Sequence, residues 1–491
     1  MGWKEAAEPV LTRMPTVTRP DGHVPFKKKL GWTAGILVLY FFLTNITLLG
    51  IHPQGGEDLF GQFRTILAGE HGSLMQVGIG PIVTASIVLQ LLGGANLLGL
   101  DTNDPRDQVL YQGLQKLLVI VMTALTALPM VFAGGFLPPA DVLQLGSLTL
   151  VGTQIQTLMF IQIFIGGILI LYMDEVVSKW GVGSGVGLFI IAGVSQLLVS
   201  GFLSMSDEGF FYSWYQILFT NEVTAGSWLS REGFNTLFIA DGGGQLLALA
   251  TTLLIFGIVV YAESVRVEIP LSHARVKGAR GRFPVKLIYA SVLPMILVRA
   301  VQANIQFMGQ ILNSQWATMP TWLGEYSDGQ VVGGFFYYTA PIYSPNDWMW
   351  WTGQVPAGIE VWQIFLRISV DLTFMVIGGA IFAIFWVETT NMGPEATAKQ
   401  IQNSGMQIPG FRQNAGVVEK VMERYIPQVT VIGGALVGLL AVWANMLGTI
   451  GAVDGTGLLL AVSITYKLYE EIAEEQLMEM HPMMRQMFGR E

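Results

Sequence analysis

Ionisable side chains are scarce in the long apolar segments of this sequence, and few of them are placed to do chemistry. Arg299 and Asp371 fall in the middle of apolar segments, and Arg367 lies one helical turn before Asp371. Charged groups inside a membrane persist mainly where they serve ion, proton or substrate binding. The spacing of Arg367 and Asp371 instead favours mutual neutralisation on one helical face.

Enzymatic and metal chemistry find no support elsewhere in the sequence. The 491 residues include no cysteine and only five histidines, which excludes a disulfide framework, an iron–sulfur cluster and a thiolate zinc site. The sequence also lacks a phosphate-binding P-loop, an HExxH motif and facing carboxylates within one span. We therefore expect no catalytic residue, no cofactor and no metal, and a protein that is not an enzyme.

The composition indicates an integral membrane protein. Hydrophobic residues make up 52% of the chain, charged residues only 12%, and the mean hydropathy is +0.52. Uncharged windows that are long enough to cross a bilayer recur along the sequence. Runs of about 20 apolar residues predict ten spanning helices, near 31–50, 77–96, 110–133, 155–177, 184–203, 243–265, 287–312, 361–388, 427–448 and 455–472.

The predicted fold is an all-α membrane protein with two pseudo-symmetric, inverted halves of five helices. Gly183-Ser184-Gly185 opens the fifth span, and Gly455-Thr456-Gly457 opens the tenth. An odd number of spans in each half gives inverted repeats, a plan that channels and transporters share and that places a path at the interface between repeats. The expected division is 1–30 for an N-terminal segment, 31–203 for the first half, 204–242 for an external insert, 243–472 for the second half and 473–491 for a tail.

Lysine and arginine gather at one end of the predicted bundle. Most of the 26 lie before the first span, in the loops 271–286 and 391–426, or near the C-terminus, whereas the connection 313–360 has none and is rich in tryptophan and tyrosine. Positive residues mark the cytoplasmic side of a membrane protein. We therefore expect a multi-pass protein of the cell membrane with both termini in the cytoplasm.

Glycines in three of the spans stand beside branched apolar residues. The sequence Gly78-Ile79-Gly80-Pro81-Ile82-Val83 begins the second span, and the fifth and tenth spans open in a similar way. A ring of such side chains can exclude water and ions by dewetting and still deform. For each residue alone, ordinary core packing is the simpler interpretation.

Six stretches of the sequence form a recognisable series: 78–92 (GIGPIVTASIVLQLL), 170–190 (ILYMDEVVSKWGVGSGVGLFI), 261–270 (YAESVRVEIP), 303–306 (ANIQ), 385–390 (FWVETT) and 455–460. Together they resemble the SecY family of protein translocation channels, and its archaeal and eukaryotic branch more than the bacterial one. The resemblance implies a ten-helix clamshell that conducts unfolded secretory polypeptides across the membrane. It also implies sideways release of hydrophobic segments into the bilayer.

The same resemblance implies roles for particular residues. The pore ring corresponds to Ile79, Val83, Val186, Ile190, Ile296 and Leu460. The plug half-helix corresponds to about 57–70, with Phe60, Phe63, Arg64, Ile66 and Leu67. Polar positions of a lateral gate, between spans two and three and spans seven and eight, correspond to Thr84, Gln90 and Asn304. The cytoplasmic ribosome-docking loops correspond to Arg275, Lys277, Arg280, Arg282 and Arg412.

Partners follow from the resemblance rather than from the residues. The family implies two small membrane subunits, equivalents of SecE and of SecG or the β subunit, together with a translating ribosome, signal sequences, unfolded polypeptides and membrane lipid. Two alternatives to a channel remain at this point. One is a secondary solute transporter with inverted repeats, and the other is a membrane scaffold without a pore.

Overall fold

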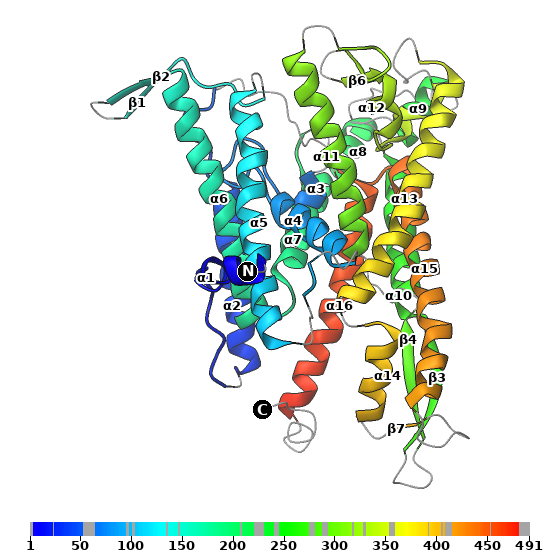
Figure 1. The fold of residues 1–491 in the computed structure, drawn as a ribbon. Coiled ribbons are helices and arrows are strands. Elements are labelled where there is room, and N and C mark those ends of the chain that lie inside the picture. Colours follow the sequence, from blue (N-terminus) through cyan, green and yellow to red (C-terminus); the bar gives the residue numbers. More distant parts are fainter. Residues whose placement is uncertain are drawn as a thin grey trace.

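Ten long helices form the body of the described part of the chain in a computed structural model (Figure 1). The structure describes residues 3–22, 24–52, 64–94, 98–100, 104–133, 136–145, 148–206, 209–219, 230–239, 245–273, 280–286, 293–316, 319–327, 330–352, 359–390, 392–403, 406–407, 415–451 and 453–480. The first half consists of α2 (Phe26–Thr44), α4 (Gly80–Gly94), α5 (Pro105–Phe132), α6 (Thr153–Trp180) and α7 (Gly185–Leu203). The second half consists of α10 (Leu246–Ser264), α11 (Leu293–Gln315), α13 (Val361–Thr389), α15 (Ala415–Leu447) and α16 (Gly455–Met480).

Each of these ten helices corresponds to one predicted span. Within the described residues, length and composition alone qualify six helices as membrane spans, namely α5, α6, α7, α10, α13 and α15, and α4 is apolar but shorter. The remaining three carry charged residues: α2 begins with lysines, α11 contains Arg299 and α16 ends in an acidic segment. Charge near a helix end lowers the mean hydropathy without shortening the apolar part.

Several helices run past the ends that the apolar runs predict. Helix α15 begins at Ala415 instead of 427 and continues through Pro427, and α16 extends to Met480 instead of ending near 472. Helix α5 begins at Pro105, where the side chain of Asp104 accepts a hydrogen bond from the Arg106 amide at 3.0 Å. Hydrophobicity marks only the part of a helix that lies in hydrocarbon, so the part that continues into water is not predicted.

Short strands outside the helical body depart from the all-helical prediction. Strands β1 (Val142–Leu145) and β2 (Leu148–Val151) form one antiparallel hairpin, and β5 (Glu325–Ser327) and β6 (Gln330–Gly333) form another. Strands β3 (Arg266–His273) and β4 (Arg280–Lys286) form a third hairpin, which β7 (Met406–Gln407) extends in the order β4-β3-β7. Much of the predicted loop 271–286 is therefore a hairpin, and the alternation of charged and apolar residues in 266–269 is typical of a strand.

The connecting segments divide between the two ends of the bundle. The upper end in Figure 1 carries β5, β6, α8 (Phe210–Phe219), α9 (Arg231–Phe238) and α12 (Gly334–Thr339), with the 3-10 turns η2 (Pro345–Asp347) and η3 (Trp350–Thr352) following α12. The lower end carries the β3–β4 hairpin, β7, α14 (Pro394–Asn403) and the C-terminal end of α16. The segments of the predicted external connections 204–242 and 313–360 thus lie at one end, and those of the basic loops lie at the other.

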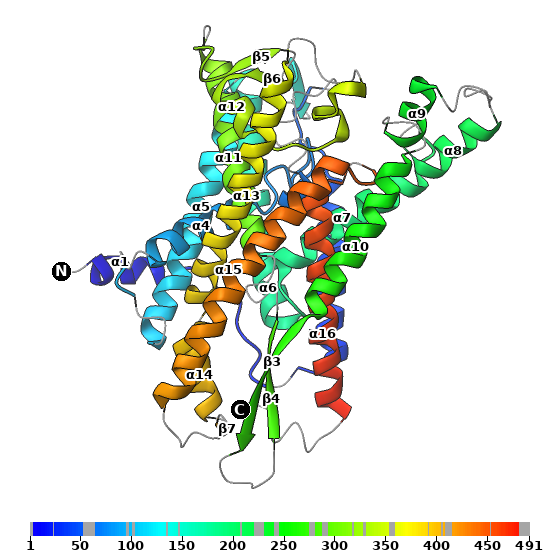
Figure 2. The same cartoon turned by 90° about the vertical axis from the view of Figure 1, so that its right-hand side faces the viewer.

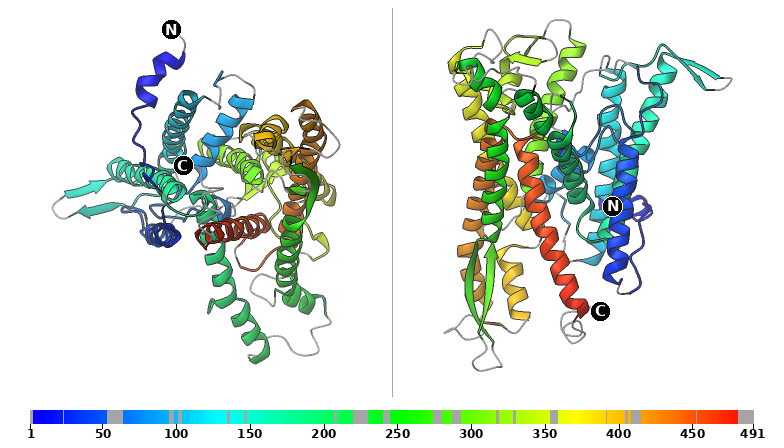
Figure 3. Two further views of the ribbon diagram at one scale, coloured as in Figure 1. Left: turned by 90° about the horizontal axis from the view of Figure 1, so that it is seen from below. Right: turned by 180° about the vertical axis from the view of Figure 1, so that it is seen from behind.

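Helices of the second half pack at backbone contact. A Cβ atom added at Gly434 of α15 would lie 2.5 Å from the Gly379 carbonyl oxygen of α13, and one at Gly438 would lie 2.4 Å from the Met375 carbonyl oxygen. Such small residues let two helix backbones approach closely in a membrane, where packing replaces the hydrophobic effect. Helix α16 also packs against α7 of the first half, and the view from behind in Figure 3 shows it between the two halves.

Candidate functional site

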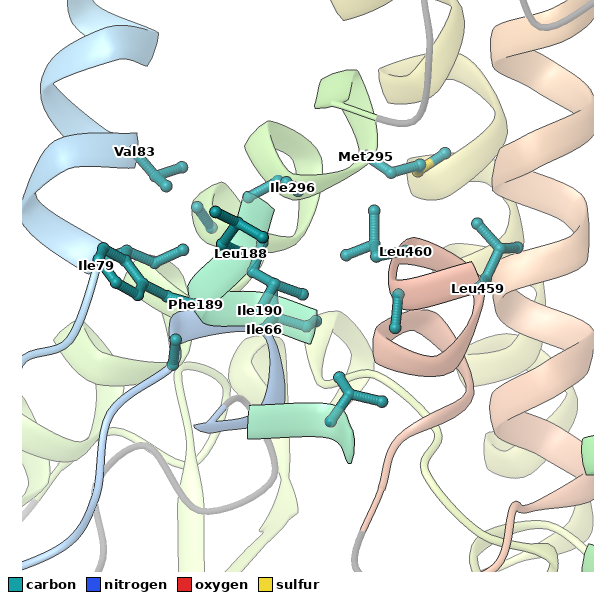
Figure 4. Close-up of a cluster of buried hydrophobic side chains, with 14 of the residues drawn as sticks. Ile66, Ile79, Val83, Leu188, Phe189, Ile190, Met295, Ile296, Leu459 and Leu460 are labelled. Carbon is teal, nitrogen blue, oxygen red and sulfur yellow. The ribbon is translucent and has the colours of Figure 1, made fainter. Parts of the chain in front are cut away.

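Six branched apolar side chains, which the sequence singles out, come from four segments of the bundle: α4 with the residue before it, α7, α11 and α16. We call them the ring residues: Ile79, Val83, Val186, Ile190, Ile296 and Leu460. They belong to the largest buried cluster, in which five of the six are buried and Val186 is partly buried. Figure 4 shows side chains from α4, α7, α11 and α16 converging there. Both halves of the chain therefore contribute to one apolar cluster, at the interface where proteins with inverted repeats have their substrate path.

Backbone contacts fix the position of Ile79 just before α4. Gly78 has a φ of +54°, and a Cβ atom there would lie 2.1 Å from the carbonyl oxygen of Leu67. That same oxygen accepts a hydrogen bond from the Ile79 amide at 2.7 Å. Only glycine fits both the left-handed conformation and the close approach. The glycine beside Ile79 thus sets the geometry that brings this side chain into the centre.

Helices α7 and α16 begin with similar contacts at their second residues, but the two Gly-Ser/Thr-Gly sequences are offset by two positions relative to these helix starts, because α7 begins at Gly185 and α16 at Gly455. At the start of α7, an Asp174 carboxylate oxygen accepts from the Val186 amide at 2.9 Å, and Asp174 lies in the preceding helix α6. At the start of α16, the Asn445 side-chain oxygen accepts from the Thr456 amide at 2.9 Å, and Asn445 lies in the preceding helix α15. Both contacts satisfy amides that a helix N-terminus leaves without partners. The similar contacts support an internal duplication and fix the segments that carry Val186, Ile190 and Leu460.

The predicted plug segment is described only in part. Helix α3 (Arg64–Leu67) is short, and Phe60 and Phe63 lie outside the described residues, as does the side chain of Arg64. Ile66 is buried in the same cluster as the ring residues, whereas Leu67 belongs to a neighbouring cluster. Helix α3 contacts α7, α11 and α16, and the Tyr40 hydroxyl donates to the Ala68 carbonyl at 2.9 Å. This segment therefore lies against helices of both halves.

Two of the three predicted gate residues are brought together. The Asn304 amide group on α11 donates to the Thr84 hydroxyl on α4 at 3.2 Å, and it also donates to the Ala300 carbonyl at 2.8 Å. Gln90 is buried, and its side-chain oxygen has no hydrogen-bond partner in the described part of the chain. Helix α4 contacts both α11 and α13, so helices of the two halves touch along this line.

A second polar contact across the same line could not be found from the sequence. The Gln315 side chain at the end of α11 donates to the Ala133 carbonyl beyond the end of α5 at 3.0 Å. A backbone carbonyl acceptor leaves no sequence signal, because it depends on where α5 ends rather than on residue type. This contact joins the upper ends of α5 and α11.

The predicted basic loops lie side by side where the structure describes them. Arg280 and Arg282 lie on β4, opposite Ser272 and Pro270 of β3. Strand β7, from the 391–426 connection, pairs with the other edge of β3. Arg275, Lys277 and Arg412 lie outside the described residues, and the side chains of Arg280 and Arg282 are not described. The sheet thus joins the two loops at the lower end of the bundle.

Buried polar groups form a network beside the ring residues. An Arg299 guanidinium nitrogen lies 3.4 Å from an Asp371 carboxylate oxygen and 2.6 Å from the Gln302 side-chain oxygen. The predicted pairing of Arg367 with Asp371 is wrong. Arg367 instead donates to the carbonyls of Ala340 and Pro341, at 3.1 Å and 2.6 Å, because the segment after α12 folds against α13 and offers these acceptors.

This polar network is structural, because its contacts hold helices together. Arg299 also donates to the Thr456 hydroxyl at 3.1 Å, which links α11 to the start of α16. Burial raises the pKa of the neighbouring Tyr343 hydroxyl well above its ordinary value, so this group stays protonated. Among the described residues, no group of three or more histidine, aspartate or glutamate side chains could hold a metal ion.

Comparison with known proteins decides between a channel and the alternatives. A family model described as SecY matches residues 73–469, and one described as the plug domain of Sec61p matches residues 38–72. The protein translocase subunit SecY of Haloferax volcanii is 71% identical over 100% of both chains. The chain belongs to the SecY family. It is therefore a protein translocase subunit that forms a protein-conducting channel, a transporter and not an enzyme, and the solute-transporter and scaffold interpretations fall away.

Solved structures of SecY-family proteins share the fold. One is a SecY protein whose plug domain stabilises the closed state of the translocation channel and maintains a membrane seal; it matches with a TM-score of 0.76, 37% identity and coverage of 97% of this chain and 98% of that one. Another is Sec61 in the canine ribosome-channel complex from the endoplasmic reticulum, with a TM-score of 0.75, 37% identity and the same coverage. The chain is thus a multi-pass membrane protein with the ten-helix SecY clamshell fold.

Proposed function

We propose that the ring residues seal the path along which an unfolded polypeptide crosses the membrane. The observation that carries this proposal is the convergence of side chains from both halves into one buried cluster. All six are branched aliphatic residues, which repel water and ions but can be pushed aside by a passing chain. Hydrolysis or group transfer plays no part, and a partner such as the translating ribosome supplies the driving force.

The segment around α3 acts as the plug in this proposal. Its contacts with α7, α11 and α16 and the burial of Ile66 beside the ring residues support a role in holding the seal. In a SecY protein 37% identical to this chain, the plug domain stabilises the closed channel and maintains a membrane seal. We extend that role to the segment 57–70 of this chain, including Phe60, Phe63, Arg64 and Leu67.

The line of contact between α4 and α11 acts as the lateral gate. The hydrogen bond between Thr84 and Asn304 supports this assignment, because a bond of this kind holds two helices together inside a membrane. Gln90, which is buried on α4, belongs to the same gate. A hydrophobic segment in transit competes with the closed contact and passes sideways into lipid.

The basic loops at the lower end of the bundle dock the ribosome. Cationic side chains at 275, 277, 280, 282 and 412 suit the phosphates of ribosomal RNA, and a related Sec61 structure is a ribosome-channel complex. This role and the distribution of positive charge both support a cytoplasmic position for the lower end and for both termini. Two small membrane subunits, like SecE and SecG or the β subunit, complete the channel in the cell membrane.

We also propose the domain division that the sequence predicts, although its last boundary falls inside α16, which continues to Met480. The two halves are 31–203 and 243–472, flanked by the segment 1–30 and a C-terminal tail from 473, with the insert 204–242 external. Opening of the clamshell separates the halves at the gate. The duplicated helix starts at α7 and α16 support this division.

An ion-leak measurement tests the seal. Ile190→Ser places a hydroxyl in the ring, and Ile163→Ser makes the same change at an equally buried isoleucine in a neighbouring cluster. In planar bilayers or vesicles, we expect the resting channel to conduct ions in the first variant and to remain tight in the second. Unchanged leak in a well-folded Ile190→Ser channel, or equal leak in both variants, would contradict the seal.

A disulfide test addresses the gate separately. Because the chain has no cysteine, the double variant Thr84→Cys and Asn304→Cys can form only one intramolecular disulfide. Oxidation should block release of a hydrophobic segment into lipid, and reduction should restore it. Normal release from the oxidised channel would show that α4 and α11 do not form the exit.

A further inference from the structure

Helix α8 is uncharged and presents an apolar face that no described part of the chain covers. Its sequence, FFYSWYQILF, contains no ionisable side chain other than tyrosine. Ser213 and Ile217 are buried on one side of the helix. The opposite side carries four exposed apolar residues: Phe211 (59% exposed), Tyr215 (58%), Leu218 (56%) and Phe219 (71%). This spacing places the exposed residues on one helical face.

The position of α8 determines what lies next to that face. Helices α8 and α9 form an arm that leaves the body near the upper ends of α7 and α10 (Figure 2). Seen from below in Figure 3, α8 reaches outside the outline of the long helices. In a membrane-embedded chain, the space beside the bundle at this level is occupied by lipid at the bilayer surface.

The apolar face of α8 is continuous with surfaces that face lipid. Helix α8 packs on α7, where the Phe202 ring lies 6.0 Å from the rings of Phe210 and Phe211. Leu203, at the end of α7, is 66% exposed, and Leu253 on the neighbouring span α10 is 65% exposed. These exposed side chains belong to spanning helices, whose apolar surface faces lipid in a membrane wherever no other protein covers it. The exposed face of α8 therefore extends an existing lipid contact outward from the bundle.

We propose that α8 is an in-plane interfacial helix that inserts its apolar face into the headgroup layer. A helix of this kind places its apolar side about 5 to 10 Å into the boundary between headgroups and acyl chains. Phenylalanine and tyrosine suit this layer because their rings are apolar or amphipathic. With the proposed orientation, the leaflet is the outer one.

The location of α8 in the chain relates this lipid contact to the movement of the two halves. Helix α8 lies in the connection between α7 and α10, which joins the two halves. A helix held at the bilayer surface there fixes how deeply the connection between α7 and α10 sits in the membrane while the two halves move relative to each other. This inference rests on membrane embedding and does not depend on the role of the ring residues.

Single-cysteine labelling tests the contact directly, because the native chain has no cysteine. Phe211→Cys, Tyr215→Cys and Phe219→Cys channels, purified with their small subunits, are labelled with an environment-sensitive fluorophore and reconstituted into phosphatidylcholine vesicles. Leu253→Cys serves as the lipid-facing control, and Glu395→Cys, on the exposed surface of α14, serves as the aqueous control. Brominated phosphatidylcholine then reports contact with acyl chains, and iodide reports contact with water.

We expect a blue-shifted emission and a loss of intensity in brominated vesicles at all three α8 positions, as at Leu253→Cys, with no loss at Glu395→Cys. Labels that respond to iodide alone would place the arm in water and overturn the proposal. Labels shielded from both quenchers would mean that a protein covers the face, which also overturns it.

A measurement on the unmodified chain guards against effects of the substitutions. A photoactivatable phosphatidylcholine in the same vesicles should label the peptide that contains 210–219. Absence of label there, with α10 labelled as expected for a span, would contradict the proposal even if the cysteine variants failed to assemble.

Discussion

At the scale of single residues, a buried charge pair is the most consequential group outside the ring. Arg299 and Asp371 are each 1% exposed, and the pair connects α11 to α13. Arg299→Leu leaves the Asp371 carboxylate without its counter-charge, which costs about 3 to 5 kcal/mol of unfolding free energy. The double variant Arg299→Leu and Asp371→Leu removes both charges, so it should lose much less. Chemical unfolding of the purified complex measures both values, and equal stability of the single variant and the native chain would contradict the pairing.

The partners of Arg367 and Asp371 could not be predicted from the sequence. The spacing of Arg367 and Asp371 along one helix predicts an ion pair. Instead, Arg367 donates hydrogen bonds to the backbone carbonyls that follow α12, and Asp371 pairs with Arg299. A backbone acceptor from a distant segment leaves no pattern in the sequence. The ring residues could be named only through the family resemblance, because each alone reads as ordinary core.

At the scale of elements, the contact between α13 and α15 depends on glycine. Gly434→Ala adds a Cβ atom 2.5 Å from the Gly379 carbonyl oxygen, so the helices must separate. We expect a loss of about 1 to 3 kcal/mol from overpacking. Gly257→Ala on α10 meets nothing within 4 Å, and it should gain up to about 1 kcal/mol from helix propensity. Thermal denaturation of the two variants compares them, and equal melting temperatures would argue against the close contact.

The ten long helices could be predicted because bilayer thickness imposes a length of apolar sequence on every span. Their ends could not, since α15 and α16 continue beyond the apolar run as helices with polar residues. Helix α8 was predicted only as part of the insert 204–242, because its 10 residues are too few to span a bilayer. The sheet of β3, β4 and β7 joins segments more than one hundred residues apart, a pairing that no local pattern specifies.

At the scale of the whole molecule, the acidic end of α16 links the halves at the lower end of the bundle. Glu475 lies 2.5 Å from Lys29 of α2 and thereby joins the two halves, whereas Glu470 contacts Arg266 and Lys286 within the second half, at the base of the β3–β4 hairpin. These partly exposed pairs contribute about 1 kcal/mol or less each.

Charge reversal tests this link between the halves. Glu475→Lys should lower the unfolding free energy, because it places two positive charges together, and adding Lys29→Glu should restore it. The coupling measured by the double-mutant cycle should weaken as salt concentration rises. Additive effects of the two substitutions would show that the pair does not couple the halves.

The ring residues come from both halves of the chain, and we propose that a polypeptide in transit passes between them. Site-specific photocrosslinking from positions 79, 190 and 296, in membranes carrying a ribosome-stalled secretory chain, tests this most directly. The proposed path predicts crosslinks to the nascent chain from all three positions and none from a lipid-facing control at Leu253. Absence of crosslinks from the three ring positions, in membranes where other proteins do capture the chain, would contradict it.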